Sequence, residues 1–295
     1  MYITINDATL YFDVEGPGLV ADGPTMRERP MLLLLHGGPG HDHIYFKPAL
    51  SALSDTAQLL YLDLRGQGRS GRPDLQTCTI EQMADDAATL CRTLGIARPV
   101  VFGHSFGGFV ALHMALRHPD LVGRLILVDT AASRAYLREA MGILEERYGT
   151  DARTVAEQVA AGDSSDAAMA EFGRLVFPAY FRDFSTAQWF HEALGRASYT
   201  PEVASHFAQH YAATYDVVDR LSEICMPTLV IVGDYDWRTP PSASRVLAAG
   251  IAGAELCVIP EAGHFPFGEQ PEAFTAAVRQ FLIADPTGIG DNAAV

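Results

Sequence analysis

Short runs of apolar residues, each ending in turn residues, alternate with helix-length stretches over most of this chain. The runs that predict buried strands lie at residues 31–35, 58–63, 100–103, 125–129, 228–233 and 255–259. Strands separated by helices form a mostly parallel sheet that helices cover on both faces. Before these runs, two alternating segments flank Asn6 and Asp7 and predict an antiparallel hairpin. The pattern therefore predicts an α/β fold with an eight-stranded sheet.

The strand and helix alternation stops between residues 131 and 221. This segment has no strand pattern and is rich in alanine, acidic and aromatic residues, which predicts several helices. We therefore expect a core formed by residues 1–130 and 222–295 and an inserted helical cap at 131–221. The cap carries a dense set of aromatic residues: Phe172, Phe177, Tyr180, Phe181, Phe184, Trp189, Phe190, Tyr199, Phe207, Tyr211 and Tyr215. Aromatic residues at this density can cover an apolar pocket as well as form the core of the cap.

Composition limits the kinds of partner. With 295 residues, 48% of them hydrophobic, the chain can bury a large core. No apolar run approaches the roughly 20 residues of a membrane span, and the first residues lack a basic and apolar leader, so we expect a cytoplasmic protein without membrane contact. The net charge of −15 disfavours nucleic acid as a partner. The four cysteines form no C-x-x-C pair, and homo-oligomerisation stays open.

A sharp bend is predicted where the strand before residue 104 meets the helical stretch 108–117. Gly103-His104-Ser105-Phe106-Gly107 matches G-x-S-x-G, in which the serine lies on a strained strand-to-helix turn. Small residues two positions away on each side let the chain close this tightly. The turn raises the hydroxyl out of the sheet and places it at a helix N-terminus, where the dipole stabilises negative charge. Ser105 is therefore the predicted nucleophile.

Backbone donors for an oxyanion are predicted in the loop after the first buried strand. His36-Gly37-Gly38-Pro39-Gly40 follows that strand directly, and its glycines let the backbone approach a substrate. A tetrahedral intermediate needs two N–H donors, and the expected pair is the amides of Gly38 and Phe106.

A seryl hydroxyl needs an adjacent base, which a carboxylate holds in one tautomer. Of the ten histidines, His264 follows the last strand and precedes a helix expected near Gln270, so its ring lies on a loop at the carboxyl edge of the sheet. Asp236, after the strand at 228–233, is the first choice for the carboxylate. Asp234 is a close rival, and Asp129, at the end of the preceding core strand, is a third alternative.

These motifs resemble the α/β-hydrolase superfamily over nearly the whole chain except the cap. Asp63-Leu64-Arg65-Gly66-Gln67-Gly68-Arg69-Ser70 is typical of that superfamily, and the order Ser, Asp, His along the chain is the order found in it. The HGGPG form is similar to the proline iminopeptidase branch. That branch usually carries GGSWG at the nucleophile, whereas this chain has GHSFG.

We predict that Ser105 attacks an acyl carbon while His264 takes its proton, and that water then hydrolyses the acyl-enzyme. This chemistry needs no cofactor and no metal. The expected substrate is a small or medium carboxylic ester or lactone, held by Gly37 and His104 of the motifs and by Phe181, Trp189 and Tyr211 of the cap.

Other activities remain open on the same triad. The main alternative is a proline iminopeptidase-like aminopeptidase, in which Glu171, Glu192 or Glu202 would bind the substrate ammonium group. A C–C hydrolase, an acyltransferase and a non-catalytic ligand-binding protein are further alternatives. Serine at position 105 disfavours enzymes with an aspartate nucleophile.

His41-Asp42-His43 has the residue types of a zinc site, because alternating histidines beside a carboxylate can ligate this ion. No complete ligand set is evident nearby in the sequence. We therefore expect a loop at the mouth of the pocket and no metal.

Overall fold

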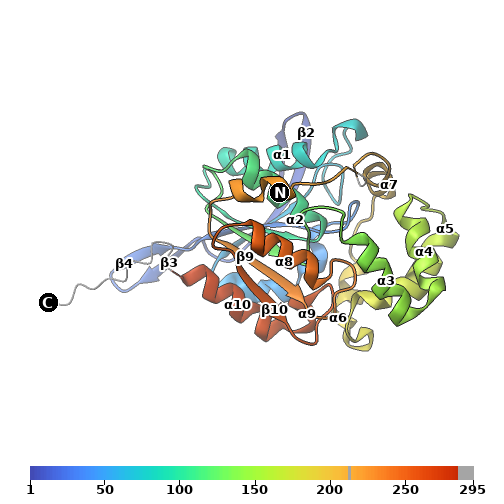
Figure 1. Ribbon diagram of the computed structural model, residues 1–295. Helices are drawn as coiled ribbons and strands as arrows, with labels where there is room; N and C mark the ends of the chain where they lie inside the picture. The colour runs from blue at the N-terminus through green and yellow to red at the C-terminus, as the bar shows by residue number, and fades with distance from the viewer. Residues whose placement is uncertain (212–213, 285–295) are drawn as a thin grey trace.

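An eight-stranded sheet runs through the middle of the molecule (Figure 1). The computed structural model describes residues 1–211 and 214–284. The strand order is β1-β2-β6-β5-β7-β8-β9-β10, with β1 and β2 antiparallel and the other six parallel to one another. The strands are β1 (Tyr2–Ile5), β2 (Ala8–Glu15), β5 (Met31–Leu35), β6 (Gln58–Asp63), β7 (Val100–His104), β8 (Arg124–Val128), β9 (Thr228–Gly233) and β10 (Glu255–Ile259). The mostly parallel eight-stranded sheet predicted from the sequence is confirmed.

Two hairpins precede the parallel strands, and the sequence pattern predicted only the first. Asn6 and Asp7 form the turn between β1 and β2 with φ of 47° and 62°, the left-handed values that a two-residue hairpin turn needs. Residues 16–30 contain a second hairpin of β3 (Leu19–Asp22) and β4 (Thr25–Glu28). It extends from the body of the molecule (Figure 1), and its side chains are mostly exposed. Because it buries no face, it has no apolar alternation to reveal it.

Successive residues of each central strand enter two different cores. Leu33, Leu35 and their equivalents on neighbouring strands pack against α1 (Ile80–Thr93), α2 (Phe106–Arg117) and α8 (Pro241–Gly250). Leu32 and Leu34 face the opposite core, which contains Phe274, Val278 and Phe281 of α10 (Pro271–Ile283). Burial on both faces explains why these strands are continuous apolar runs.

The remaining helices lie mainly between β8 and β9. They are α3 (Leu137–Tyr148), α4 (Thr150–Ala160), α5 (Asp166–Glu171), α6 (Gln188–Leu194) and α7 (Pro201–His210), with the short α9 (Pro266–Glu269) close to the C-terminus. Helices α3 to α6 gather at one end of the sheet (Figure 1). Between β8 and β9, the described part of the chain forms no strand; a single bridge pairs Ser133 with Asp216. Residues 212–213, in the predicted cap, and 285–295, in the predicted core, lie outside the described residues.

No described helix has both the length and the apolar composition that crossing a bilayer requires.

Candidate active site

Ser105 occupies a strained turn between β7 and α2. Its φ of 53° and ψ of −118° are rare for a residue with a side chain, and its N–H donates to the carbonyl of Val128 at 3.0 Å. The residue is the N-cap of α2, so its hydroxyl lies beside the positive end of the helix dipole. The structure therefore has the strand-to-helix bend that the sequence predicted.

Gly103 and Gly107 allow the chain to close around this bend. A Cβ on Gly103 would lie 2.4 Å from the carbonyl oxygen of Gly107, and a Cβ on Gly107 would lie 2.0 Å from that of Leu35. Both distances are far below van der Waals contact with rigid backbone atoms. Only glycine fits at either position, because β5, β7 and the start of α2 meet there.

The side chains of Ser105, His264 and Asp236 form one hydrogen-bonded row. His264 Nε2 lies 3.0 Å from Ser105 Oγ, and His264 Nδ1 lies 2.9 Å from Asp236 Oδ2. The ring is 3% exposed and the carboxylate 0%, so little water competes for these bonds. Three loops that follow β7, β9 and β10 bring the residues together at the carboxyl edge of the sheet.

Asp236 is held as a carboxylate by its donors. Its Oδ1 accepts from the backbone N–H groups of Arg238 at 2.7 Å and Thr239 at 3.3 Å, and its Oδ2 accepts from the Thr239 hydroxyl at 2.7 Å as well as from His264. Burial alone would raise the pKa of Asp236, but the charge of His264 and these hydrogen bonds lower it below its ordinary value. An ionised Asp236 favours the tautomer with the proton on Nδ1.

The two rival carboxyl groups have different surroundings. Asp234 is exposed, and its carboxylate accepts from the N–H of Ala262 at 3.3 Å. Asp129 is fully buried and lies in the same cluster as Asp236 and His264, with one ligand-type atom of each within 4.8 Å of the others. Burial, and then the charge of Asp236, raise the pKa of Asp129 well above its ordinary value. Among the three aspartates, the hydrogen bond to His264 is therefore made by Asp236, and the neighbouring Asp129 has a raised pKa.

Two backbone N–H groups near Ser105 have no acceptor among the described residues, those of Gly38 and Phe106. Gly38 has a φ of 57° and lines the same cavity as Ser105, while Phe106 is the first residue of α2. The preceding amide is already used, because Gly37 N–H donates to the Tyr45 hydroxyl at 2.5 Å. The arrangement leaves the Gly38 and Phe106 amides available for an oxyanion.

His104 forms hydrogen bonds with two other segments of the site, those of Tyr45 and His264. The Tyr45 hydroxyl lies 2.8 Å from its Nδ1, and its Nε2 lies 2.8 Å from the carbonyl of His264. Burial, followed by repulsion from His264, holds the pKa of His104 well below its ordinary value. A neutral ring that accepts at Nδ1 and donates at Nε2 satisfies both bonds, so His104 positions the loop of His264.

The sequence predicted no role for Glu269, whose carboxyl group holds the loop of His264 by accepting backbone hydrogen bonds. Its Oε1 accepts from Gly263 N–H at 2.9 Å and Phe265 N–H at 3.3 Å, and its Oε2 accepts from Arg182 N–H at 2.6 Å. Burial raises the pKa of this carboxyl to about 7. An acidic residue five positions after the predicted base was the only sequence signal.

A cavity of about 500 Å³ opens over Ser105 and is mostly apolar. This volume suits a small or medium ligand. Gly37 and His104 line it, together with aromatic residues from within and outside the segment 131–221: Tyr45, Phe106, Phe109, Tyr136, Phe172, Phe177, Tyr180, Phe190, Tyr199, Phe207, Trp237 and Phe265.

Three aromatic residues predicted for substrate binding lie elsewhere. Phe181 is 1% exposed and stacks on Phe265 behind the cavity wall, Trp189 packs beside Phe267, and Tyr211 packs on Phe207. None of the three belongs to the described lining of the cavity. The density of aromatic residues along the sequence identified the segment that lines the cavity. Which side of each helix faces the cavity depends on tertiary packing.

The three residues of the His41-Asp42-His43 motif make different contacts in the structure. His41 lines the cavity, the Asp42 carboxylate accepts from the N–H groups of Ile44 at 3.0 Å and Ser198 at 2.8 Å, and His43 turns away to bond Asp63 at 2.6 Å. The two histidines and the carboxylate between them therefore do not converge on one point.

The D-x-R-G-x-G-x-S motif joins β6 to the first hairpin. Buried Arg65 bonds both carboxylate oxygens of Asp86, at 2.7 and 2.8 Å, and the carbonyl of Asn6 at 2.8 Å. The Ser70 hydroxyl donates to Asp63 O and accepts from Tyr11 N–H. The motif thus stabilises the fold, outside the described lining of the cavity.

Comparisons with known proteins agree with this fold. The family model described as "alpha/beta hydrolase fold" matches residues 30–271. The proline iminopeptidase PfmaB of Pestalotiopsis fici is 29% identical over 288 residues, which cover 95% of this chain and 98% of that protein. A thermophilic esterase from Thermogutta terrifontis, solved with malate bound, is 31% identical with a TM-score of 0.66, and 93% of each chain is covered. The enol-lactonase of Burkholderia xenovorans LB400 is 26% identical with a TM-score of 0.69, covering 96% of this chain and all of that one. The chain therefore belongs to the α/β-hydrolase fold family.

Proposed function

We propose that this hydrolase cleaves a small or medium carboxylic ester or lactone through an acyl-enzyme on Ser105. The observation that carries the proposal is the buried row from Ser105 Oγ through the His264 ring to Asp236, with spacings of 3.0 and 2.9 Å. Distances of this size allow direct proton transfer between the nucleophile and its base.

The reaction begins when Ser105 Oγ attacks the carbonyl carbon and its proton moves to His264 Nε2. The negative oxygen of the tetrahedral intermediate accepts hydrogen bonds from the N–H groups of Gly38 and Phe106. The imidazolium then donates its proton to the leaving oxygen, and the C–O bond breaks to leave an acyl-enzyme. A water deprotonated by His264 attacks the acyl carbon, and the same steps run in reverse order to release the acid.

In this proposal residues 131–221 form a cap over Ser105. Lining residues of the cavity come both from this segment, such as Phe177 and Phe207, and from the sheet side, such as Trp237 and Phe265. The apolar wall on both sides would hold an acyl group and exclude water from its ester bond.

The names of the relatives support several related activities. An esterase and an enol-lactonase are among the similar solved structures, which favours ester and lactone substrates, whereas the similarity to PfmaB favours an aminopeptidase. An aminopeptidase must bind a substrate ammonium group. Glu171, Glu192 and Glu202, the acids considered for that role, are exposed and lie outside the described cavity lining. We therefore rank the ester or lactone activity first.

Covalent labelling and a substrate panel test this proposal. A fluorophosphonate probe should add one mass label to Ser105, and ester or lactone substrates should be turned over faster than prolyl amides. Ser105→Ala and His264→Ala should each lower kcat by about 10⁴-fold, and the double variant should be little worse, because the two residues act as a unit. His118→Ala, at a surface histidine bonded to Asp85, is the matched control. Faster turnover of the prolyl amide, or losses that add in the double variant, would contradict the proposal.

A further inference from the structure

Two arginines, Arg134 and Arg238, line the cavity that contains Ser105. We propose that they bind a carboxylate on the substrate, so that the enzyme prefers an ester or lactone carrying a second, free acid group. This inference rests on the hydrolase function proposed above and names the substrate class of the same site.

Neither guanidinium has an acidic partner within ion-pair distance among residues 1–211 and 214–284. The ion pairs there use other arginines, Lys47 or histidines. Asp236 is close to Arg238, but its oxygens already accept from His264, Thr239 and the backbone of Arg238. Both guanidiniums thus keep donors that only neutral groups of the protein or a ligand can satisfy.

The two charges also act on each other. Burial lowers the pKa of Arg134, and repulsion from Arg238 lowers it further. Arginine nevertheless stays protonated at any physiological pH. Burial also disfavours the charge of Arg238, but Tyr136, Tyr180 and Asp236 raise its pKa. A carboxylate would therefore mainly lower the cost of burying Arg134, while accepting N–H donors from both arginines.

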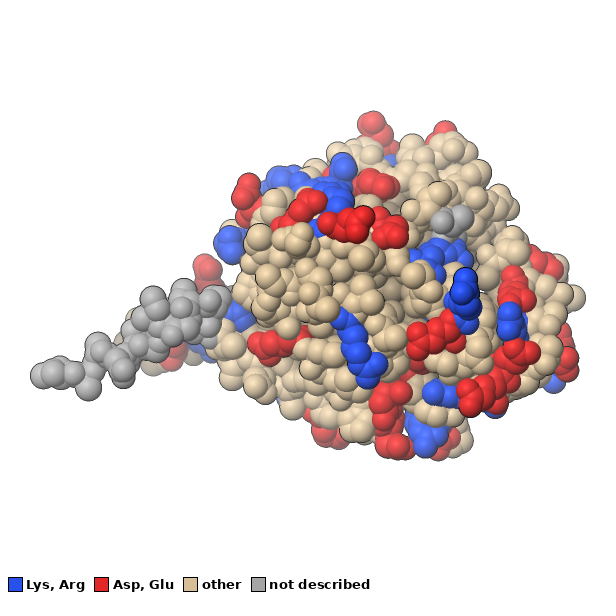
Figure 2. Space-filling view, in the orientation of Figure 1, with Lys and Arg blue, Asp and Glu red and all other residues tan. Residues whose placement is uncertain are grey.

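The described lining of the cavity contains one acidic residue, although the chain as a whole is strongly acidic. On the face drawn in Figure 2, acidic and basic side chains lie at several places on the outer surface. Some exposed acids pair with arginines, as Glu171 does with Arg174 at 2.6 Å. The acidic residue in the described cavity lining is Asp42, whose oxygens accept backbone N–H groups. The described lining therefore carries cationic donors and one carboxylate that is already used.

Arg238 is held a short distance from the reacting atoms. Its Nη1 donates to the Tyr136 hydroxyl at 3.5 Å, and the Tyr180 hydroxyl lies beside the same guanidinium. The ring of Tyr180 in turn packs edge-on against His264, with centroids 5.3 Å apart. The ring of Tyr180 thus contacts His264 while its hydroxyl lies beside the Arg238 guanidinium, so one side chain spans from the arginine to the imidazole.

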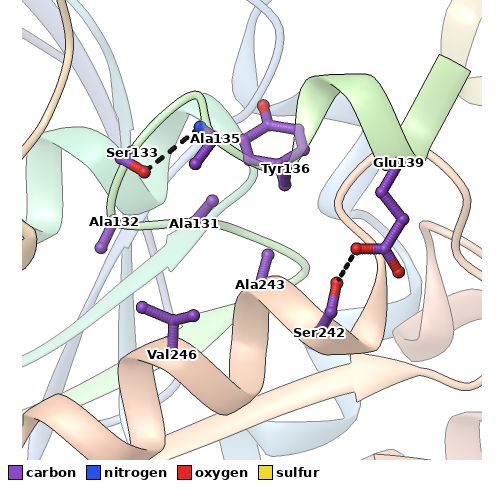
Figure 3. Close-up of a pocket in the computed structure, with 9 residues that line it drawn as sticks. All are labelled: Ala131, Ala132, Ser133, Ala135, Tyr136, Glu139, Ser242, Ala243 and Val246. Carbon is purple, nitrogen blue, oxygen red and sulfur yellow. Dashed lines mark hydrogen bonds between the residues drawn. The ribbon is translucent and has the colours of Figure 1, made fainter.

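The segment that carries Arg134 is fixed by contacts on its other side. Figure 3 shows this side, a smaller cavity of about 210 Å³, where Ser133 Oγ accepts from Ala135 N–H and Ser242 donates to Glu139. Tyr215 also donates to the carbonyl of Ala131 at 3.0 Å. Because the backbone around Arg134 is held in place, anion binding has to order its side chain but not its backbone.

Matched pairs of substrates test the inference. In the first pair, mono-4-nitrophenyl glutarate is compared with the neutral methyl 4-nitrophenyl glutarate, which places the acid on the acyl side. In the second pair, 4-(butyryloxy)benzoic acid is compared with 4-(butyryloxy)benzamide, which places the acid on the leaving group. The readout is the ratio of kcat/KM for the acid to that for its neutral analogue. We expect this ratio to be at least tenfold on one arm.

Arginine variants connect the preference to the two side chains. Arg134→Gln and Arg238→Gln should each lower the ratio by about 10- to 100-fold, the size expected for a charged hydrogen bond, and the Lys variants should keep part of it. Arg138→Gln, at an exposed arginine of α3, is the control and should leave the ratio unchanged.

Three results would overturn the inference. Ratios of one or less on both arms would refute the carboxylate preference while leaving the hydrolase function intact. A preference that persists in both Gln variants would refute the role of the arginines. No turnover of any ester would refute the hydrolase function as well, so the two failures can be told apart.

Discussion

Three aspartates are candidates for the carboxylate that orients His264, and replacing each of them by asparagine separates their roles. Asparagine keeps the shape of the side chain and removes only the charge and one acceptor. In Asp236→Asn, the backbone donors of Arg238 and Thr239 hold the amide oxygen in the place of Oδ1. The amide nitrogen then points at His264 Nδ1 and donates to it, so the ring proton moves to Nε2 and faces Ser105.

The expected loss in kcat is about 10⁴-fold, because an imidazole protonated at Nε2 cannot accept the seryl proton. This corresponds to about 5 kcal/mol in activation free energy. Asp129→Asn should change kcat by less than about tenfold, because burial and the charge of Asp236 already disfavour the ionised form of Asp129, and its bond from Gly233 N–H at 2.9 Å survives. Asp234→Asn, at an exposed side chain, should be close to neutral.

The assay is steady-state hydrolysis of a 4-nitrophenyl ester at pH 7.5, with thermal unfolding of each variant to confirm that it is folded. A loss of less than tenfold in Asp236→Asn would refute the assignment of the orienting carboxylate. If Asp129→Asn loses as much as Asp236→Asn, then Asp129 is ionised and shares that role. A severe loss in Asp234→Asn would transfer the role to the exposed residue.

Two further predictions concern stability. Glu269 has a pKa raised from 4.5 to about 7, so the folded state retains its proton longer than the unfolded state and stability falls as pH rises from 4.5 through 7. Urea titrations should measure the unfolding free energies of the native protein and of Glu269→Gln. The difference, native minus variant, should fall by about 3 kcal/mol between pH 4.5 and 8. A difference that does not change with pH would contradict the raised pKa of this buried carboxyl. Arg65→Met leaves buried Asp86 without its main partner and should cost about 3–5 kcal/mol in urea unfolding, while Arg65→Met with Asp86→Leu should recover much of this. A double variant no more stable than the single one would argue against the ion pair as the cause.

The sequence by itself determined the sheet and the strand-to-helix bend that carries Ser105. Buried parallel strands must be apolar on both faces, so β5 to β9 were visible as short runs with boundaries accurate to about a residue, as was the partly exposed edge strand β10. The bend at Ser105 was equally visible, because Gly103 and Gly107 are required by local backbone contacts and leave a fixed spacing. Constraints that act within a few residues leave a local pattern in the sequence.

Only the tertiary structure decided which distant groups meet. The sequence ranked Asp236 first but left Asp234 and Asp129 open, and the bond to His264 together with the backbone donors at residues 238 and 239 distinguished Asp236. The exposed hairpin of β3 and β4 left no periodicity, and the aromatic density of the cap did not tell that Phe181 faces inward to the core. Arg134 and Arg238 come from loops about a hundred positions apart, so their shared cavity depends on packing that no local pattern records.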